Sequence, residues 1–155
     1  MILLKILIIR GNLKSINDNL GAINLKEGFS MASKFEIVKI DDQFRFHLKA
    51  VNGEIILSSQ PYSSLASCKK GIESIRVNAP IAPIEDQTIE GFTIEKNPKF
   101  EVYEYRNGDY RFRLKARNGE LIGTGDRYKS KAGCQNGIDS IKKNSVEAII
   151  VEEEN

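Results

Sequence analysis

The sequence has few of the residues from which catalytic and metal sites are usually built. Its 155 residues include two cysteines and a single histidine. Two cysteines are too few for a disulfide scaffold, and their scarcity is typical of proteins from a reducing compartment. One histidine, with no exposed cysteine expected beside it, does not supply the three or four converging ligands of a metal site. The sequence therefore predicts a cytoplasmic protein with no metal and no cofactor.

Strong charge and long apolar runs are also missing. The net charge is +2, and residues 1–30 account for all of it with four basic and two acidic side chains. The balanced remainder lacks the basic footprint of a duplex-DNA-binding domain. The apolar run over residues 1–10 is interrupted by Lys5 and is too short for a bilayer, which needs ~20 apolar residues. No small-residue cleavage site follows it, so neither a secretory signal nor membrane association is expected.

Residues 1–30 have two interpretations. The run over residues 1–10 can form a β-strand or a frayed amphipathic end. We favour a second hypothesis, because the repeated unit described next begins just after Met31. In addition, Lys26–Gly28 can be encoded by a ribosome-binding sequence a short distance upstream of a start codon. On this hypothesis residues 1–30 are a leader of doubtful nativeness, in which upstream sequence is read as protein.

The rest of the chain contains one pattern twice. Residues 34–78 align with residues 99–144 at 21 identical positions out of 45, with one extra residue in the second copy. Such self-similarity identifies an internal duplication. Each copy has three short runs of alternating apolar and polar residues, which predict β-strands. An Asn-Gly pair, at residues 52–53 and 118–119, separates the second run from the third and predicts a type I′ hairpin turn.

An α-helix is predicted to close each copy. Ser64 and Ser130 are suitable N-caps, because a serine hydroxyl accepts a hydrogen bond from an otherwise unpaired backbone N–H. Apolar residues then recur at i, i+4 and i+7, which places them in one stripe on the helix. These residues are Cys68, Ile72 and Ile75 in the first copy and Cys134, Ile138 and Ile141 in the second. Gly71 and Gly137 lie in mid-helix and indicate a close helix–helix or helix–sheet contact.

These patterns predict an α+β fold, because a single β-β-β-α unit buries too little apolar surface to be stable alone. Two units can share one antiparallel sheet, with both helices packed on one face. A fourth strand is expected after each helix, at residues 146–151 in the second copy. In the first copy it is expected at residues 81–84 or 88–94, within a proline-containing linker. The predicted organisation is a first repeat (31–80), a linker (81–98) and a second repeat with an acidic tail (99–155), all within one structural domain (31–155).

One face of the predicted sheet carries basic and aromatic side chains. Side chains alternate along a strand, so the residues between the core positions of the second run all point away from the helices. The candidate anion-binding or nucleic-acid-binding face consists of Arg45, His47, Lys49, Tyr103, Tyr105, Arg111, Arg113, Lys115 and Arg117. Cations beside aromatic rings can bind a base and its phosphate. Alternatively, Glu36 and Glu101 on the same face neutralise these cations through cross-strand ion pairs, which is the interpretation we favour.

Other chemistry is not indicated by the remaining residues. His47 is expected on the open face and Cys68 in the core, so they do not form a nucleophile–base pair. No glycine-rich phosphate loop is present. Lys129 and Lys131 precede or begin the second helix, where an anion is favoured, but the first copy has no lysine at these positions. The sequence therefore predicts a protein that is not an enzyme.

The repeated motif resembles a known family. The pattern F-R-F-x-L-K-A-x-N-G-E-I-I, then a tyrosine, then S-x-A-x-x-x-G-I-x-S-I-x-x-N, is similar to the YegP family of small uncharacterised bacterial proteins. The resemblance extends from Met31 to about Asn144 and departs from the pattern at Pro61. It implies tandem β-β-β-α(-β) units in one antiparallel sheet, with the C-terminal strands exchanged between the halves, one of them within residues 81–98. It implies no established activity and no catalytic residue.

We expect from this a small cytosolic accessory or interaction module that is not an enzyme. The alternative function is weak binding of nucleic acid or a nucleotide on the basic open face of the sheet. Its partners are unknown at this point. A protein partner or a second copy can pair with the edges of the sheet, since an open sheet leaves two strands with unpaired backbone groups.

Overall fold

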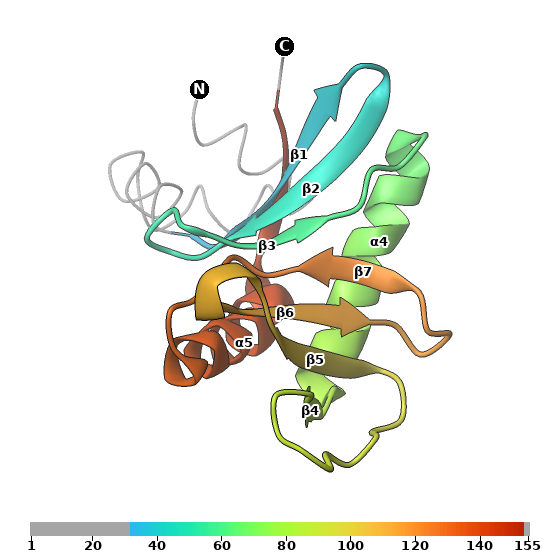
Figure 1. Ribbon diagram of the computed structural model, residues 1–155. Coiled ribbons are helices and arrows are strands. Elements are labelled where there is room, and N and C mark those ends of the chain that lie inside the picture. Colours follow the sequence, from blue (N-terminus) through green and yellow to red (C-terminus); the bar gives the residue numbers. More distant parts are fainter. Residues whose placement is uncertain (1–31, 154–155) are drawn as a thin grey trace.

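Eight strands form a single open sheet in the order β4-β5-β6-β7-β3-β2-β1-β8, as Figure 1 shows. The computed structural model describes residues 32–153, so the prediction for residues 1–30 lies outside the described residues. In chain order the elements are β1 (Lys34–Ile40), β2 (Gln43–Lys49), β3 (Ile55–Ser59), α4 (Leu65–Asn78), η1 (Ala79–Ile81), β4 (Ile84–Asp86), β5 (Lys99–Glu104), η2 (Arg106–Gly108), β6 (Tyr110–Lys115), β7 (Leu121–Thr124), α5 (Lys131–Glu147) and β8 (Ile149–Glu152). The α+β class and the two repeat units are as predicted.

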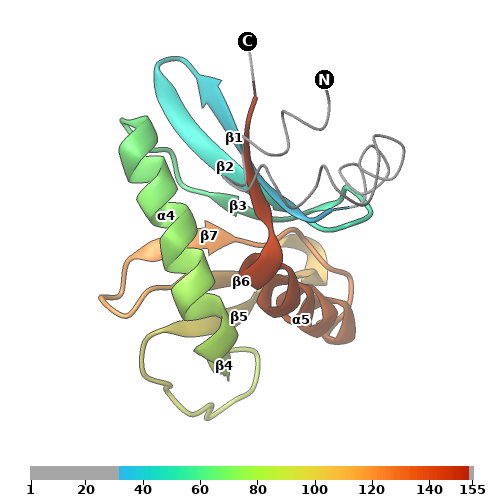
Figure 2. The ribbon, with the colours of Figure 1, turned by 180° about the vertical axis from the view of Figure 1, so that it is seen from behind.

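The two helices cover one face of the sheet. Figure 2, which shows the molecule from behind, has both α4 and α5 in front of the strands. Each helix begins at its predicted cap, because Ser64 Oγ accepts from the N–H of Ser67 at 3.1 Å and Ser130 Oγ accepts from the N–H of Gly133 at 3.0 Å. The apolar stripes of both helices are buried, including the two cysteines.

The strand alternation places aromatic side chains under the helices. Phe35 of β1 and Phe46 of β2 are fully buried and pack edge to face, with ring centroids 5.7 Å apart. Phe100 and Phe112 repeat this arrangement in the second half at 5.8 Å. Both repeats therefore contribute the same layer of residues to one continuous core, which confirms the predicted assignment of the apolar face.

The glycines in the two helices allow a tyrosine to approach. A Cβ built on Gly71 would overlap the hydroxyl of Tyr62, and a Cβ on Gly137 would overlap that of Tyr128. Each tyrosine stacks on a core phenylalanine of its own repeat, at 6.2 Å between the centroids of Phe46 and Tyr62. The close contact is therefore on the sheet side and not between the helices, and it is made by a tyrosine ring and by a core phenylalanine, Phe46 or Phe112.

The turn between the second and third strands differs from the prediction. A type I′ turn needs positive φ at both central residues, but among the described residues Asn52 and Asn118 are not in that region, whereas Gly53 and Gly119 are at φ 86°. Gly53 N–H donates to Ala50 O, and Ala50 N–H donates to Glu54 O, both at 2.9 Å. This is a three-residue loop closed by a glycine in the left-handed region. The asparagine instead uses its side chain, since Asn52 Oδ1 accepts from Glu54 N–H at 3.0 Å.

The strands after the helices are exchanged between the halves. β8 follows the second helix but pairs with β1 of the first repeat, and β4 follows the first helix but pairs with β5 of the second. Both exchanged strands run parallel to their neighbours, while the six inner strands are antiparallel. The predicted exchange and single sheet are confirmed, with this parallel pairing at both edges as the difference. The first exchanged strand begins at Ile84, and residues 88–94 form no strand.

A cation from each helix holds the incoming strand of the other repeat. Arg76 of α4 donates to Ala148 O, just before β8, at 2.7 Å and lies over the Phe35 ring. Lys142 of α5 occupies the equivalent position, donates to Ala82 O at 2.8 Å, and lies over the Phe100 ring. Because the two contacts are related by the repeat, the exchange is a property of both units.

A buried serine in α5 provides a test of the packing. Ser145 is 0 % exposed, and its Oγ has no hydrogen-bond partner, whereas the first repeat has Ala79 at the same position. A buried hydroxyl without a partner costs free energy, and alanine is also the better helix former. Ser145→Ala is therefore expected to raise the free energy of unfolding by about 1 kcal/mol. Urea denaturation measures this change, and an equal loss of stability would show that the hydroxyl has a partner.

Candidate binding face on the open side of the sheet

A row of side chains, all polar except one, crosses the open face from one edge of the sheet to the other. The row is given by the strand registers and follows the repeat symmetry about the β3–β7 junction. From the β8 edge to the β4 edge it consists of Val151, Glu36, His47, Ser58, Thr124, Arg113, Glu101 and Glu85. We call these residues the central row. The predicted open-face residues His47 and Arg113 hold equivalent places in it.

The first repeat neutralises its part of the face locally. Lys49 Nζ lies 2.6 Å from Glu36 Oε2. His47 Nδ1 shares a 2.8 Å hydrogen bond with Ser58 Oγ. Burial lowers the pKa of His47, and Glu36 opposes this shift. The imidazole is therefore held neutral at physiological pH between a hydroxyl and an ion pair. Arg45 is exposed at the next position along β2.

The second repeat contains a buried charge cluster that the sequence interpretation missed. Lys99 Nζ lies 2.7 Å from Glu85 Oε2 and 3.5 Å from Glu101 Oε2, and the three side chains are 10 %, 2 % and 5 % exposed. Gln87 Nε2 donates to both carboxylates, and the N–H of Glu95 donates to Glu85 Oε2 at 2.7 Å. Residues of the linker therefore complete the hydrogen bonding of this part of the open face.

The cluster fixes the charge of Glu85. Burial alone would raise the pKa of this carboxyl, but hydrogen bonds from Lys99, Gln87 and the Glu95 backbone lower it to about 2. The pKa of Lys99 is raised, chiefly by its hydrogen bond to Glu85. The first repeat has no such cluster, because Val151 takes the place of Glu85 in the central row.

Glu101 also neutralises the predicted cations of β6. Arg113 Nε lies 2.6 Å from Glu101 Oε1, and Lys115 Nζ lies 3.5 Å from the same atom. Together with the pairing of Lys49 and Glu36, these contacts answer the question left open by the sequence. Cross-strand ion pairs neutralise the middle of the basic face, as the favoured interpretation expected. Positive charge remains as separate points at Arg45, Arg111 and Arg117, none of which forms an ion pair within residues 32–153.

An arginine lies over the ring of each predicted tyrosine of this face. Arg113 lies over the Tyr103 ring at 5.0 Å, and Arg111 lies over the Tyr105 ring at 4.9 Å. Arg106 also lies over Tyr105, at 5.6 Å. These side chains already occupy ring surface that a nucleotide base would need for stacking. The equivalent residues of the first repeat are Val38 and Ile40, so the fold itself does not require the stacks.

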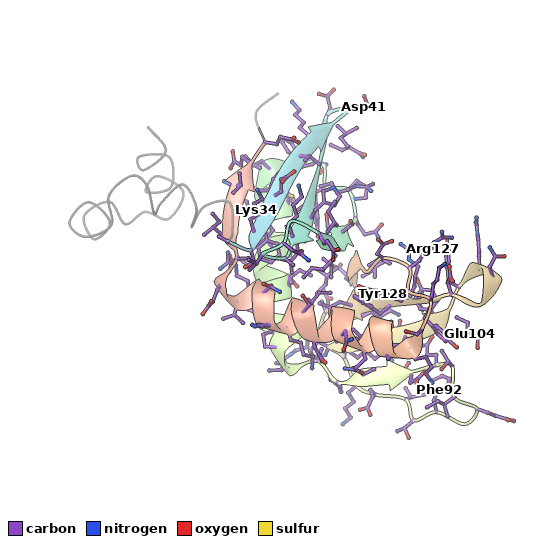
Figure 3. The ribbon with its side chains drawn as sticks, turned by 90° about the vertical axis from the view of Figure 1, so that its left-hand side faces the viewer. Lys34, Asp41, Phe92, Glu104, Arg127 and Tyr128 are labelled. Atoms are coloured by element: carbon purple, nitrogen blue, oxygen red, sulfur yellow. The ribbon has the colours of Figure 1, made fainter. Side chains whose placement is uncertain are left out.

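A hollow of about 240 Å³ lies at the junction of the two repeats. The residues that line it are Ile55, Leu57, Ser58, Arg111, Thr124, Gly125 and Asp126. Of the predicted face residues only Arg111 reaches it. Arg111 Nε donates to Gly125 O at 3.1 Å, which fixes the guanidinium at the wall of the hollow. Figure 3 shows Arg127 and Tyr128, which follow the lining residues, near the turn that ends β5 at Glu104.

The possible nucleophiles lie on the other side of the sheet. Cys68 and Cys134 are buried under the helices, and burial raises the pKa of both thiols to about 11. Both are therefore protonated at neutral pH, and His47 is on the opposite face. Lys131, at the start of α5, lies 2.8 Å from Asp86 of β4 and so is used in an ion pair. Within residues 32–153 no group of three or more potential ligands is placed to hold a metal ion.

Comparison with known proteins identifies the family. The model described as "Domain of unknown function (DUF1508)" matches the chain twice, over residues 41–86 and 106–152. The chain belongs to the DUF1508 family. The two matches end with the last residues of β4 and β8, so the DUF1508 unit includes the exchanged strand.

This DUF1508 chain is similar to relatives of nearly its own length and also to a relative about as long as one unit. A UPF0339 protein of Pseudomonas aeruginosa is 38% identical over 124 residues, which are 79% of this chain and 99% of the relative. The solution NMR structure of YegP from Escherichia coli, a protein of unknown function, has 36% identity and a TM-score of 0.65, covering 81% of this chain and 97% of that one. A UPF0339 protein of Treponema denticola is 54% identical over 54 residues, 93% of its own length but 35% of this chain. The predicted membership of the YegP family is confirmed.

In the described part of this DUF1508 chain, no helix is able to cross a bilayer. Across residues 32–153, neither α4 nor α5 combines the length and the apolar character that a membrane span requires.

Proposed function

We propose that the protein is a non-enzymatic interaction module of the cytosol that binds its partner on the open face of the sheet. The proposal rests on one observation: the potentially reactive side chains are already paired, hydrogen-bonded or buried. Glu36, Glu85 and Glu101 of the open face are paired with cations, and His47 is hydrogen-bonded to Ser58. The two thiols are buried and protonated at neutral pH. Among these groups of residues 32–153, no pair is poised to transfer a proton to or from a substrate.

The open face is the favoured surface because the helices cover the opposite side. It carries a hollow, three arginines without ion pairs among residues 32–153, and two arginine–tyrosine stacks that the first repeat lacks. The hollow is asymmetric, and Arg117 and the two stacks occur in one repeat only, so these features are not needed to build the shared fold. They are therefore the positions at which a binding role can have been added.

Two experiments test this role. The protein and a variant with Arg45, Arg111 and Arg117 replaced by glutamine are immobilised and compared for retention of the same partner from a cell extract. We expect a partner that the unaltered protein retains and the variant releases, because these three arginines lie outside the hydrophobic core and the variant is expected to remain folded. Turnover in a broad hydrolase screen that is lost on His47→Ala or Glu101→Gln would contradict the proposal.

Weak binding of single-stranded nucleic acid or a nucleotide is the second candidate. Arg45, Arg111 and Arg117, which form no ion pair within residues 32–153, favour it. The ion pairs along the central row and the arginines that already cover Tyr103 and Tyr105 oppose it. Binding of this kind depends on phosphate contacts and weakens steeply with salt. Titration of a fluorescent oligonucleotide measures it, and no binding at low salt removes this candidate.

A further inference from the structure

The hollow at the repeat junction is asymmetric although the fold around it is symmetric. Ser58 of β3 and Thr124 of β7 are equivalent in the two repeats and are paired across the junction. Arg111 lines the hollow, but its equivalent, Arg45, does not. The same is true of Asp126, whose equivalent is Gln60. The first repeat contributes β3 to the hollow, whereas both charged lining residues come from the second repeat.

Arg111 is prepared to bind an oxyanion. Its Nε is bonded to Gly125 O at 3.1 Å, and its guanidinium rests on Tyr105, whose ring is also contacted by Arg106. Arginine has five N–H donors, and within residues 32–153 no carboxylate pairs with this one. Because the guanidinium group is already held in place, less conformational entropy is lost when a carboxylate binds to it. Arg111 is thus a fixed cation with unused donors.

The rest of the wall offers a different set of contacts. Ile55 is 43% exposed and gives the hollow an apolar side. Thr124 contributes a hydroxyl. Asp126 contributes a carboxylate that is exposed and bonded only to the N–H of the next residue, at 2.8 Å. One fixed cation, one carboxylate, a hydroxyl and an apolar side are complementary to a ligand that carries both charges.

We propose that the hollow binds a small zwitterion with one carboxylate, one ammonium group and a short apolar part, which is the chemistry of a free aliphatic amino acid. The carboxylate pairs with Arg111, the ammonium group with Asp126, and the apolar part lies against Ile55. The volume of about 240 Å³ is below the ~300–1,000 Å³ of drug-sized pockets, which limits the ligand to a small molecule. The inference rests on the proposed role of the open face.

An NMR titration of the whole chain tests the proposal with three probes. L-valine carries both charges, N-acetyl-L-valine lacks the ammonium group, and L-valinamide lacks the carboxylate. We expect L-valine at millimolar concentration to shift the backbone amide signals of Ser58, Thr124 and Gly125. The other two probes are expected to bind about tenfold more weakly, because each loses one charge-assisted contact. No shift with any probe would overturn the proposal.

Three variants separate this site from general charge effects. Arg111→Gln is expected to abolish the L-valine shifts, while Arg45→Gln, its equivalent outside the hollow, leaves them unchanged. Asp126→Asn is expected to make L-valine and N-acetyl-L-valine bind equally. Shifts that persist in Arg111→Gln, or that disappear in Arg45→Gln, would contradict the site. Retention of a protein partner in the capture experiment is a separate readout, so a failed titration leaves the proposed interaction role standing.

Discussion

Lys99→Met is expected to destabilise the protein by about 3–5 kcal/mol at neutral pH. Lys99 lies between Glu85 and Glu101, and all three side chains are almost inaccessible to water. Removing the ammonium group leaves two buried carboxylates facing each other, and Glu85 keeps only neutral donors. The cost of an uncompensated buried charge therefore exceeds that of the packing change.

The pH dependence of this variant distinguishes lost charge from lost packing. In the unaltered protein the pKa of Glu85 is lowered to about 2, so its stabilising contribution is present above about pH 4.5 and is lost as the pH falls toward 2. Without Lys99, burial is opposed only by the hydrogen bonds from Gln87 and the Glu95 backbone, so the pKa of Glu85 is expected to rise. Protonation at low pH then removes the unpaired buried charge. Urea denaturation at pH 7 and pH 4 should show a smaller difference at pH 4. Lys96→Met is the control, because Lys96 is exposed on the linker; an equal loss at both pH values would contradict this account.

Gly123→Ala is expected to cost about 1–3 kcal/mol, because it overpacks the junction between the repeats. A Cβ at this position would lie 2.5 Å from Leu57 Cδ2 and 2.8 Å from Leu57 Cγ. Leu57 is 1 % exposed and cannot move into solvent. Leu57→Ala alone is expected to cost about 2–5 kcal/mol by leaving a cavity.

A double-mutant cycle measures whether these residues are in contact. In the Leu57→Ala background the atoms that Gly123→Ala would meet are gone, so the second substitution should then cost little. We expect a coupling of at least 1 kcal/mol, within the 0.5–3 kcal/mol seen for residues in contact. Additive costs would show that β3 and β7 do not meet as described.

The pair of Leu57 and Gly123 also shows what a duplicated chain permits. The two residues are equivalent in the repeats, and a large side chain in one fills the space left by the other. In a symmetric assembly of identical single units, equivalent positions would carry the same residue on both sides of the junction. When the units are joined in one chain, the two sides of the junction can carry different residues that fit each other. The asymmetric hollow is a second case in which equivalent positions differ.

Local sequence patterns were sufficient to predict the elements and their faces. Alternation in the strands assigned Phe46 to the core and Arg113 to the open face, and capping assigned the starts of both helices at Ser64 and Ser130. These signals depend on residues close together in the sequence. The Asn-Gly turns were predicted wrongly because the same pair suits both turn types, and Ala50 decides between them through its hydrogen bonds to Gly53 and Glu54.

The site depends on contacts that the sequence pattern does not encode. Glu85 was not recognised because it lies in a three-residue strand within the linker, and its partner Lys99 is 14 residues away. The hollow was missed because Arg111 reaches Gly125 and lines the same hollow as Asp126 only after β6 and β7 are in register. A comparison of the repeats gave one usable signal, since Tyr105 and Asp126 differ from their equivalents Ile40 and Gln60.

The most direct test concerns the exchange of β4 and β8 between the halves of one chain. Nuclear Overhauser contacts report which strand lies beside β8. We predict contacts between Ile150 and Phe35 and between Val151 and Glu36, the residues paired across β8 and β1. In a mixture of isotope-labelled and unlabelled chains these contacts should arise within single chains. Contacts of β8 with β5 of its own repeat, or contacts that arise only between chains, would contradict the exchanged fold.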